Sequence, residues 1–203
     1  MRFDTYEDEP LEFGGTSIQG SAAPAVKWLF ENGHIKPGQI VLDYGAGKYA
    51  RNADFLRKNG CKVWAYDPFN FNGKEGWEEG SVSDDLPEND IFDVAFSCFV
   101  LNVVPLREER AITLRCRALA EERFHIVRNK DILEMIKKAL QRQDKFVYKF
   151  YIEKFGGNQD PSEEEIVKFA KFGTQTSSGF QRLSDVEGSE VIKSTSGYKI
   201  YRD

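Results

Sequence analysis

The sequence predicts an α/β fold, in which helices cover both faces of a sheet. Strand-like and helix-like segments alternate along most of the chain, and this alternation is typical of βαβ units. A short apolar strand at 40–42 runs into two glycines, Gly45 and Gly47, and sheets of this kind bind ligands outside the carboxyl ends of their strands. The 203 residues are 40% hydrophobic and 30% charged. That balance is ordinary for a globular protein and argues against a coiled-coil, collagen-like or wholly disordered chain.

The amino-terminal half alternates helix and strand signals. Five elements are expected there: a helix at 22–32, a strand at 40–42, a helix at 49–59, a strand at 62–66 and a brief strand at 81–83. The first helix has apolar side chains at helical spacing, and Gly60 ends the second where a left-handed residue is typical. Residues 1–20 are polar, acidic and contain glycines, so we expect an arm or lid there.

The carboxyl-terminal half contains the most apolar segment of the chain. Its expected elements are a strand at 93–103, a helix at 105–121, a strand at 124–127, a helix at 131–141, a strand at 146–152, a helix starting near 160 and a β-hairpin of 190–194 with 198–201. The strand at 146–152 is expected from aromatic and β-branched residues, and a helix there stays open. Pro161 and the acids after it favour a helix start. Residues 160–182 are therefore expected to form a helix plus a substrate-side loop.

The glycines after the first strand are the main candidate binding loop. They allow a tight turn and a close approach to a ligand, because no Cβ stands in the way. Asp67 ends the next strand, where a carboxylate can bind a ribose diol. The pattern also satisfies a dinucleotide motif, but the carboxylate of Asp43 would repel a pyrophosphate and suits a ligand with an ammonium and a sulfonium. S-adenosylmethionine (SAM) is such a ligand. A nicotinamide or flavin dinucleotide, and a turn without any ligand, stay open as alternatives.

At these residues the chain resembles the class I SAM-dependent methyltransferases. The likeness runs from about 22 to 99 and is carried by four motifs: 41–47, 66–68, 84–87 and 92–97. It implies a Rossmann-like fold with a mostly parallel seven-stranded sheet. It also implies that 43–47 hold the methionine part of SAM, Asp67 the ribose, and Asp84 or Asp85 the adenine. The expected cofactor-binding residues are Asp43, Tyr44, Gly45, Ala46, Gly47, Asp67, Pro68, Asp84, Asp85 and Ser97.

A narrower likeness covers later segments. Residues 100–104, 109–110 and 173–181 are similar to segments of small methyltransferases that occur beside DNA phosphorothioation systems and are themselves assigned mostly by sequence. The resemblance therefore implies no particular substrate for this chain. Residues 97–100 depart from the Asn/Asp-Pro-Pro-aromatic motif with which amino-methyltransferases bind an exocyclic amine, and no Pro-Cys nucleophile for cytosine C5 follows.

Three polar residues near the expected active edge are candidates for catalysis. Asn102 lies in an apolar stretch and either orients the substrate or ties down the loop between strand and helix. Arg128 follows a short strand and either holds an anion or pairs with a surface acid. His125 lies between Phe124 and Ile126, so a structural histidine competes with a catalytic base.

The polar stretch at 173–181 supplies the candidates for substrate binding. Its hydroxyl and amide side chains either bind the acceptor or form an exposed polar loop; the candidates are Thr174, Gln175, Thr176 and Gln181. No metal site is expected, because His34 and His125 are far apart and no acids have ligand spacing.

Charge and cysteine content bear on partners and location. The net charge is −5 with a pI near 5.3, which argues against holding nucleic acid by bulk electrostatics. Residues 107–154 nevertheless carry 13 Lys and Arg against 8 Asp and Glu, so a nucleic-acid partner stays open beside a solvated basic helix. The three cysteines form no close pair, and the first residues turn acidic at once. We therefore expect a cytoplasmic protein without a signal peptide or membrane span.

Together these features predict a single domain, residues 1–203, that acts as a SAM-dependent methyltransferase on an unidentified acceptor, with a link to nucleic-acid modification left open. A chain of this kind supplies mainly proximity and alignment for a direct methyl displacement. The alternatives are a non-catalytic accessory subunit of a nucleic-acid modification or defence complex, and an enzyme that degrades SAM. The oligomeric state is not predicted.

Overall fold

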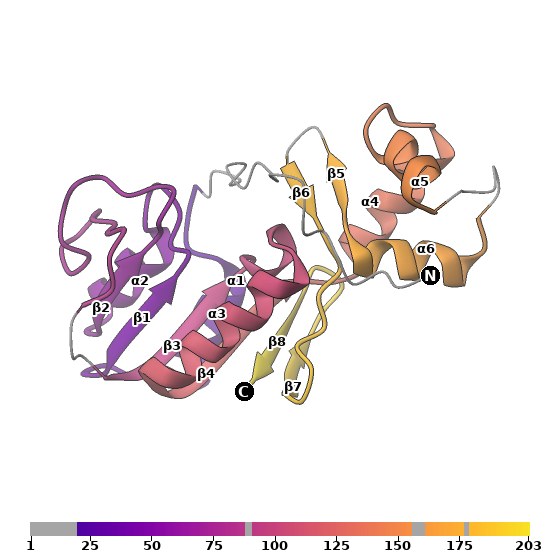
Figure 1. The fold of residues 1–203 in the computed structure, drawn as a ribbon. Helices are drawn as coiled ribbons and strands as arrows, with labels where there is room; N and C mark the ends of the chain where they lie inside the picture. Colours follow the sequence, from indigo (N-terminus) through magenta and orange to yellow (C-terminus); the bar gives the residue numbers. More distant parts are fainter. Residues whose placement is uncertain (1–19, 88–90, 156–160, 177–178) are drawn as a thin grey trace.

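A six-stranded mixed sheet forms the centre of the molecule (Figure 1). The computed structural model describes residues 20–87, 91–155, 161–176 and 179–203, so the arm expected at 1–20 lies outside the described residues apart from Gly20. The sheet has the order β2-β1-β3-β4-β8-β7. Its strands are β1 (Ile40–Tyr44), β2 (Lys62–Tyr66), β3 (Phe92–Cys98), β4 (Ala120–Arg128), β7 (Glu190–Ser194) and β8 (Tyr198–Arg202). Only β8 runs against the others within this sheet.

The described residues form a sheet of six strands, so the expected number of seven is wrong by one. The brief strand expected at 81–83 is reduced to a single parallel bridge between Tyr66 and Ser83. The segment 67–87 is rich in glycine, proline, asparagine and aspartate, which favour turns over a pleated strand. It follows β2 as a long irregular loop, here called the β2 loop.

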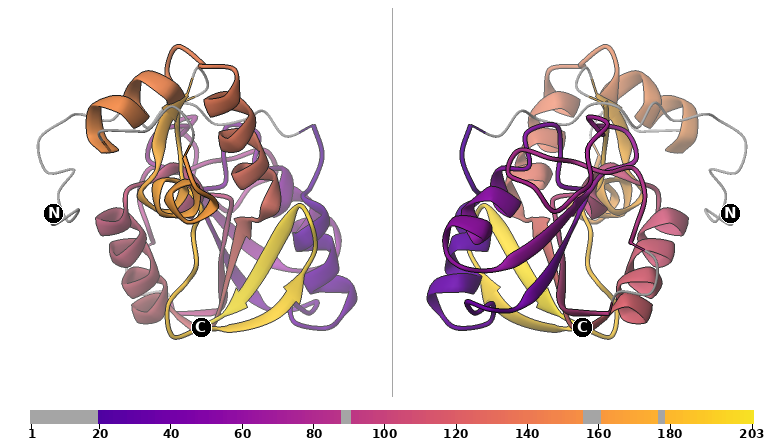
Figure 2. Two further views of the ribbon diagram at one scale, coloured as in Figure 1. Left: turned by 90° about the vertical axis from the view of Figure 1, so that its right-hand side faces the viewer. Right: turned by 90° about the vertical axis from the view of Figure 1, so that its left-hand side faces the viewer.

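Helices cover both faces of the sheet, as the sequence predicts (Figure 2). The helices α1 (Pro24–Glu31) and α2 (Arg51–Lys58) bury Val26, Leu29 and Leu56 against one face. On the other face α3 (Leu106–Leu119) buries Ile112 and Cys116. None of the helices in the described ranges is long and apolar enough to cross a membrane, and α3, with 14 residues, is the longest of them.

A second packed unit follows β4. Its helices are α4 (Lys130–Gln141), α5 (Val147–Phe155) and α6 (Glu163–Phe172), which share a core that includes Ile136, Tyr151 and Phe169. A two-stranded hairpin of β5 (Thr174–Thr176) and β6 (Gly179–Gln181) comes next. Figure 1 shows this unit next to the carboxyl end of β4 and the outer edge of the sheet.

Several expected elements differ from the structure. Residues 146–152 are not a strand but lie at the start of α5. The Asp144 carboxylate accepts hydrogen bonds from the amides of Phe146 and Val147 at 3.0 and 3.1 Å and so caps the helix. Val147 and Tyr151, one helical turn apart, are both buried. Within 173–181, where a loop is expected, the described residues form two paired antiparallel strands, β5 and β6. The strand expected at 93–103 ends at Cys98, because Phe99 has φ +62°, and a 3-10 turn, η1 (Leu101–Val103), follows.

The helix ends are set by local capping. The α6 helix starts at Glu163, because the Ser162 hydroxyl accepts from the Glu165 amide while the Glu165 carboxylate accepts from the Ser162 amide. This capping box moves the start three residues beyond 160. The expected hairpin at the end of the chain is confirmed as β7 and β8.

Candidate functional site

The glycine turn at 45–47 lies at the carboxyl ends of β1 and β2. The amides of Gly45 and Ala46 both donate to the carbonyl of Tyr66, at 2.7 and 3.0 Å, so the turn folds back onto the end of β2. Gly45 and Gly47 have φ of +81° and +68°, the left-handed region that favours glycine. A Cβ on Gly45 would overlap the Val100 side chain, whereas a Cβ on Gly47 would meet none of the described residues within 4 Å. Packing therefore requires Gly45, and open space lies beside Gly47.

Asp67 connects the glycine turn to the β2 loop. One carboxylate oxygen accepts from the Gly47 amide at 2.9 Å, and the other accepts from the amides of Phe69 and Asn70 at 3.0 and 3.1 Å. Asp67 is 4% exposed. Two loops that follow neighbouring strands are thus held in register by a single carboxylate.

Asp43 is a buried carboxylate next to the same turn. It lies two residues after Val41 on β1, on the face that α1 and α2 cover. Among the described residues neither of its oxygens makes a hydrogen bond of good geometry, although the Ala53 amide is near enough to favour the charged form. Burial raises the pKa of Asp43 to about 8, the charge of Arg57 opposes that rise, and Asp67 adds to it. A cation bound here would satisfy the carboxylate and lower its pKa.

The remaining predicted cofactor residues are divided between the rim and the interior. Pro68, Asp84 and Asp85 are exposed, and the Asp85 backbone carbonyl accepts from the Trp64 indole at 3.0 Å. Tyr44 is buried, with its hydroxyl 3.3 Å from the Arg115 guanidinium; burial raises its pKa to about 12.

Ser97 and His125 form a buried pair on the α3 side of the sheet. The Ser97 hydroxyl is 2.9 Å from Nδ1 of His125, and both residues are completely buried. The Nε2 atom of His125 has no hydrogen-bond partner in the described part of the chain. Burial lowers the pKa of His125 to about 4. The ring is therefore neutral at pH 7.

Asn102 and Arg128 are both engaged by neighbouring groups. The Asn102 side chain accepts from the Arg128 amide at 2.6 Å and donates to the Arg182 carbonyl at 2.8 Å. Its own carbonyl accepts from the Arg182 amide at 2.7 Å. The Arg128 guanidinium pairs with Asp131 at 2.7 Å. Asn102 thus ties η1 to the end of β4 and to the residue after β6.

A buried ion pair, which the sequence analysis misses, extends this network. Arg182 and Glu109 are 4% and 5% exposed and form a salt bridge, and Arg182 also donates to the Leu101 carbonyl at 3.3 Å. Burial lowers the pKa of Arg182 to about 10, so it stays charged at pH 7. The two residues are 73 positions apart, and no local pattern in the sequence connects them.

The candidate substrate residues lie on the β5–β6 hairpin. Thr174 is completely buried and pairs in register with Gln181. Gln181 is 7% exposed, and its Oε1 atom lacks a hydrogen-bond partner in the described ranges. The Thr176 hydroxyl donates to the Gly179 carbonyl at 2.8 Å. The side chain of Gln175 lies outside the described residues.

No family model matches the sequence, and no curated protein matches it either. Solved structures do. A candidate Zn-dependent alcohol dehydrogenase from Rhodobacter sphaeroides has a TM-score of 0.51 at 14% identity, over 90% of this chain and 89% of that one. Magnesium protoporphyrin IX methyltransferase from Synechocystis, with bound S-adenosylhomocysteine (SAH), has 0.49 at 18%, over 88% and 78%. A candidate SAM-dependent methyltransferase from Listeria monocytogenes has 0.48 at 13%, over 89% and 98%.

The strand order β2-β1-β3-β4-β8-β7, with helices on both faces, is that of a Rossmann-like α/β fold. The likeness to the Rhodobacter protein, at 14% identity and a TM-score of 0.51, supports that statement about architecture alone. The α/β class and the helices on both faces are confirmed, with six strands in place of seven. The narrower resemblance to methyltransferases of DNA phosphorothioation systems finds no support in these comparisons.

Proposed function

We propose that this chain is a methyltransferase that binds SAM at the glycine turn. The observation that carries the proposal is Asp43, a fully buried carboxylate without a hydrogen bond among the described residues, next to a turn whose Gly47 leaves open space. A buried acid without a partner is costly unless something compensates it. The ammonium and sulfonium of SAM are cations of the kind that would compensate Asp43.

The other groups of SAM match the residues at the same end of the sheet. Asp67 already holds both loops. Its Oδ1 atom accepts three hydrogen bonds, from Phe69 and Asn70, whereas Oδ2 accepts from the Gly47 amide and has a further lone pair for a ribose hydroxyl. We assign Asp84 and Asp85, which are exposed, to accept from the adenine amino group. A dinucleotide would instead bring a pyrophosphate up to the turn next to Asp43, and the ionised carboxylate of Asp43 would repel it. Bound SAM supplies an electrophilic methyl group.

The residues of the chain then position and shield the reacting groups. We place the acceptor over η1 and the β5–β6 hairpin, where the buried amide of Gln181 has an oxygen without a partner in the described ranges. Asn102 fixes the loop beneath it. The resemblance to methyltransferases near DNA phosphorothioation systems is the ground for including nucleic acids among the acceptors to be screened.

A second candidate function has a specific observation in its favour. Asn102, Arg128 and His125, the three candidates for catalysis, are each hydrogen-bonded or ion-paired within the chain. This arrangement suits a SAM-binding accessory protein that transfers no methyl group. Transfer of a labelled methyl group from SAM to an extracted nucleic-acid, protein or metabolite pool would exclude this candidate, and formation of the thioether product without a methylated acceptor would indicate SAM breakdown.

Calorimetric titration with SAM, SAH and NAD tests the cofactor. We expect SAM and SAH to bind and NAD not to bind. Gly47→Ala places a methyl group in the open space of the turn and should weaken SAM binding at least tenfold. Gly33→Ala is the matched control. Gly33 also has a positive φ (+73°) and open space around it, but it lies at the end of α1. Each substitution adds roughly 1 kcal/mol of backbone strain. Equal SAM affinities of both variants and the wild type would contradict the proposed site.

A further inference from the structure

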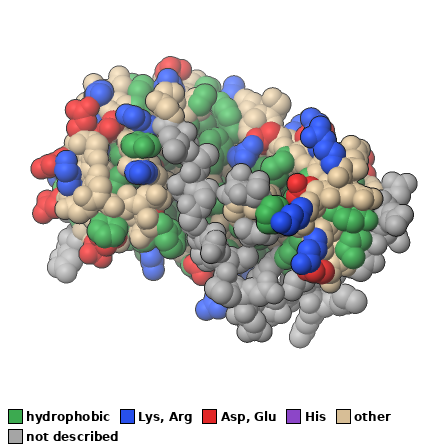
Figure 3. All heavy atoms as spheres, turned by 90° about the horizontal axis from the view of Figure 1, so that it is seen from above, with side chains coloured by type: hydrophobic (Ala, Val, Ile, Leu, Met, Phe, Trp, Pro, Cys, Tyr) green, Lys and Arg blue, Asp and Glu red, His purple; other side chains and the backbone are tan. Residues whose placement is uncertain are grey.

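A hollow of about 570 Å³ lies between the start of α2 and the β2 loop. The residues that line it are Lys48, Tyr49, Arg51, Asp54, Phe69, Asn70, Phe71, Asn72 and Gly80. Figure 3 looks down on this end of the molecule and shows, on the left over the α2 side, basic and hydrophobic side chains next to one another. The hollow adjoins the glycine turn but lies on the outer side of β1, towards β2 and α2.

Three aromatic side chains of the hollow are accessible to solvent. Tyr49, Phe69 and Phe71 are 39%, 65% and 53% exposed. Exposed aromatic residues that gather in one place mark binding surfaces more often than isolated ones do. Rings of this kind on two neighbouring loops offer stacking platforms for a planar ligand.

The charge of the hollow is positive in an acidic chain. The ammonium of Lys48 and the guanidinium of Arg51 lie 5.7 and 5.3 Å from the centre of the Tyr49 ring. The one carboxylate in the lining, Asp54, accepts from Arg57 at 2.7 Å and from the Gly80 amide at 2.9 Å. Two cations therefore face a ligand without an uncompensated acid among the described lining residues. This arrangement favours an anionic group next to the rings.

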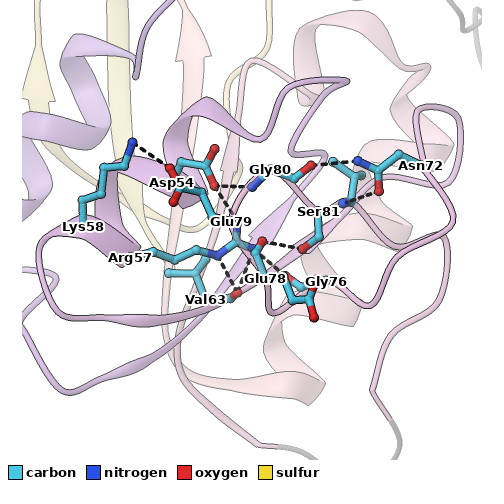
Figure 4. A network of polar contacts seen from close by, with 11 residues as sticks. Asp54, Arg57, Lys58, Val63, Asn72, Gly76, Glu78, Glu79, Gly80 and Ser81 are labelled. Carbon is cyan, nitrogen blue, oxygen red and sulfur yellow. Dashed lines mark hydrogen bonds and ion pairs between the residues drawn. The ribbon is translucent and has the colours of Figure 1, made fainter.

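Polar contacts hold the wall of the hollow in a fixed shape (Figure 4). The Asn72 side chain donates to the Gly80 carbonyl at 2.7 Å and accepts from the Val82 amide at 3.0 Å. Arg57 donates to the Val63 carbonyl at 3.0 Å and to the Gly76 carbonyl. The β2 loop is thus pinned to α2 and β2 before any ligand arrives, and a preformed site loses less entropy on binding.

We propose that this hollow is a second binding site, for a phosphorylated planar ring, that is, a nucleotide. The base stacks on Phe69 and Phe71, and the phosphate lies at Lys48 and Arg51. The ligand is either a free nucleotide or a nucleotide of a single strand. The site goes beyond the proposed function, because the lining of the hollow contains none of the residues assigned to SAM, which are Asp43, Gly47, Asp67, Asp84 and Asp85.

Binding measured with the full chain, first without SAM and then with saturating SAM, tests this proposal. The probes are 5′-AMP, adenosine, and a fluorescently labelled ten-nucleotide oligo(dA), followed by calorimetry and fluorescence anisotropy. We expect Phe71→Ala to weaken binding roughly tenfold, the range found for loss of one stacked base. Phe146→Ala is the matched control, because Phe146 is 42% exposed and has the Lys145 ammonium 5.6 Å from its ring, at the start of α5. This control should bind like the wild type.

Each probe decides a separate point. Binding of 5′-AMP without the oligonucleotide supports a free nucleotide, and tighter binding of the oligonucleotide supports a single strand. Adenosine should bind more weakly than 5′-AMP, because it lacks the phosphate. The proposal is overturned if no probe binds, if Phe71→Ala and Phe146→Ala bind equally, or if SAM displaces 5′-AMP. If the wild type does not bind SAM, the methyltransferase proposal is contradicted, whereas binding of 5′-AMP or the oligonucleotide still tests the hollow.

Discussion

The carboxyl ends of β1 and β2 differ from those of β3 and β4, although both belong to one edge of one sheet. Near β1 and β2, the buried carboxylate of Asp43 has no hydrogen bond among the described residues, and Gly47 faces open space. Near β3 and β4, Asn102 uses both ends of its amide on backbone groups, and Arg182 is paired with Glu109 in the interior. The carboxylate of Asp43 at the first place therefore lacks the partners that Asn102 and Arg182 have at the second place.

The difference separates a ligand site from a structural joint. A buried polar group that is fully hydrogen-bonded stabilises one arrangement of the chain, while one without a partner lowers stability until something binds it. On this argument Asp43 indicates a site for a cation, and the Asn102 network holds η1, α3 and the hairpin in place. Substitutions at the two places should therefore change stability in opposite directions.

The largest effect is expected at the buried ion pair. Arg182→Met leaves the Glu109 carboxylate buried without its partner and should lower the free energy of unfolding by about 3–5 kcal/mol. Urea denaturation followed by circular dichroism measures the change. A loss below about 1 kcal/mol would show that the network is not a structural joint.

The double variant Arg182→Met/Glu109→Leu is the control for this prediction. It removes both charges and should recover a large part of the loss, because apolar replacements of a buried ion pair are often neutral or stabilising. A double variant as unstable as Arg182→Met alone would assign the loss to packing of the Arg182 side chain instead of its charge.

Asp43→Asn should have the opposite sign. The folded-state pKa of Asp43 is raised from 3.8 to about 8, so the folded protein holds a proton that the unfolded chain releases, and stability falls as the pH rises from about 4 to 8. Removing the ionisable group should raise the free energy of unfolding at pH 8 by about 1–3 kcal/mol, with little gain at pH 4. Denaturation at both pH values measures this change.

The same variant should lose SAM binding in calorimetry. Wild-type SAM affinity should rise with pH between 6 and 8, because binding a cation next to Asp43 releases its proton. A variant that is destabilised at pH 8, or that binds SAM as tightly as the wild type, would break the comparison between the two places.

The glycine turn was predictable from sequence because its determinants are local. Asp43, Gly47 and Asp67 belong to one strand–turn–helix–strand unit, and the spacing from turn to acid places both at the same edge. The Arg182–Glu109 pair joins distant segments, so one sequence contains no signal for it. The aromatic segment at 146–152 fits a strand and a helix alike, and the contact of Val147 and Tyr151 with α4 and α6 decides for the helix.

The hollow escaped prediction for the same reason. Tyr49 follows the glycine turn, while Phe69 and Phe71 belong to the β2 loop, and only the parallel pairing of β1 with β2 brings these loops together. The seventh strand, in contrast, was expected from the resemblance, and the turn-forming residues of 67–87 replace it with a single bridge.

The smallest effect is expected at His125, which belongs to β4 and pairs with Ser97 of β3 at the second place. Its folded-state pKa is lowered from 6.5 to about 4. As the pH falls, the unfolded chain therefore takes up a proton on His125 before the folded protein does. The free energy of unfolding decreases as the pH falls from about 6.5 towards 4. Between pH 7 and 5 this should cost about 1–2 kcal/mol. Because Asp43 changes stability in the opposite direction over that interval, the measurement is made in the Asp43→Asn background. There, His125→Asn, which keeps a hydrogen-bonding atom for Ser97, should flatten the acid side of the profile; an unchanged slope would mean that another group titrates there.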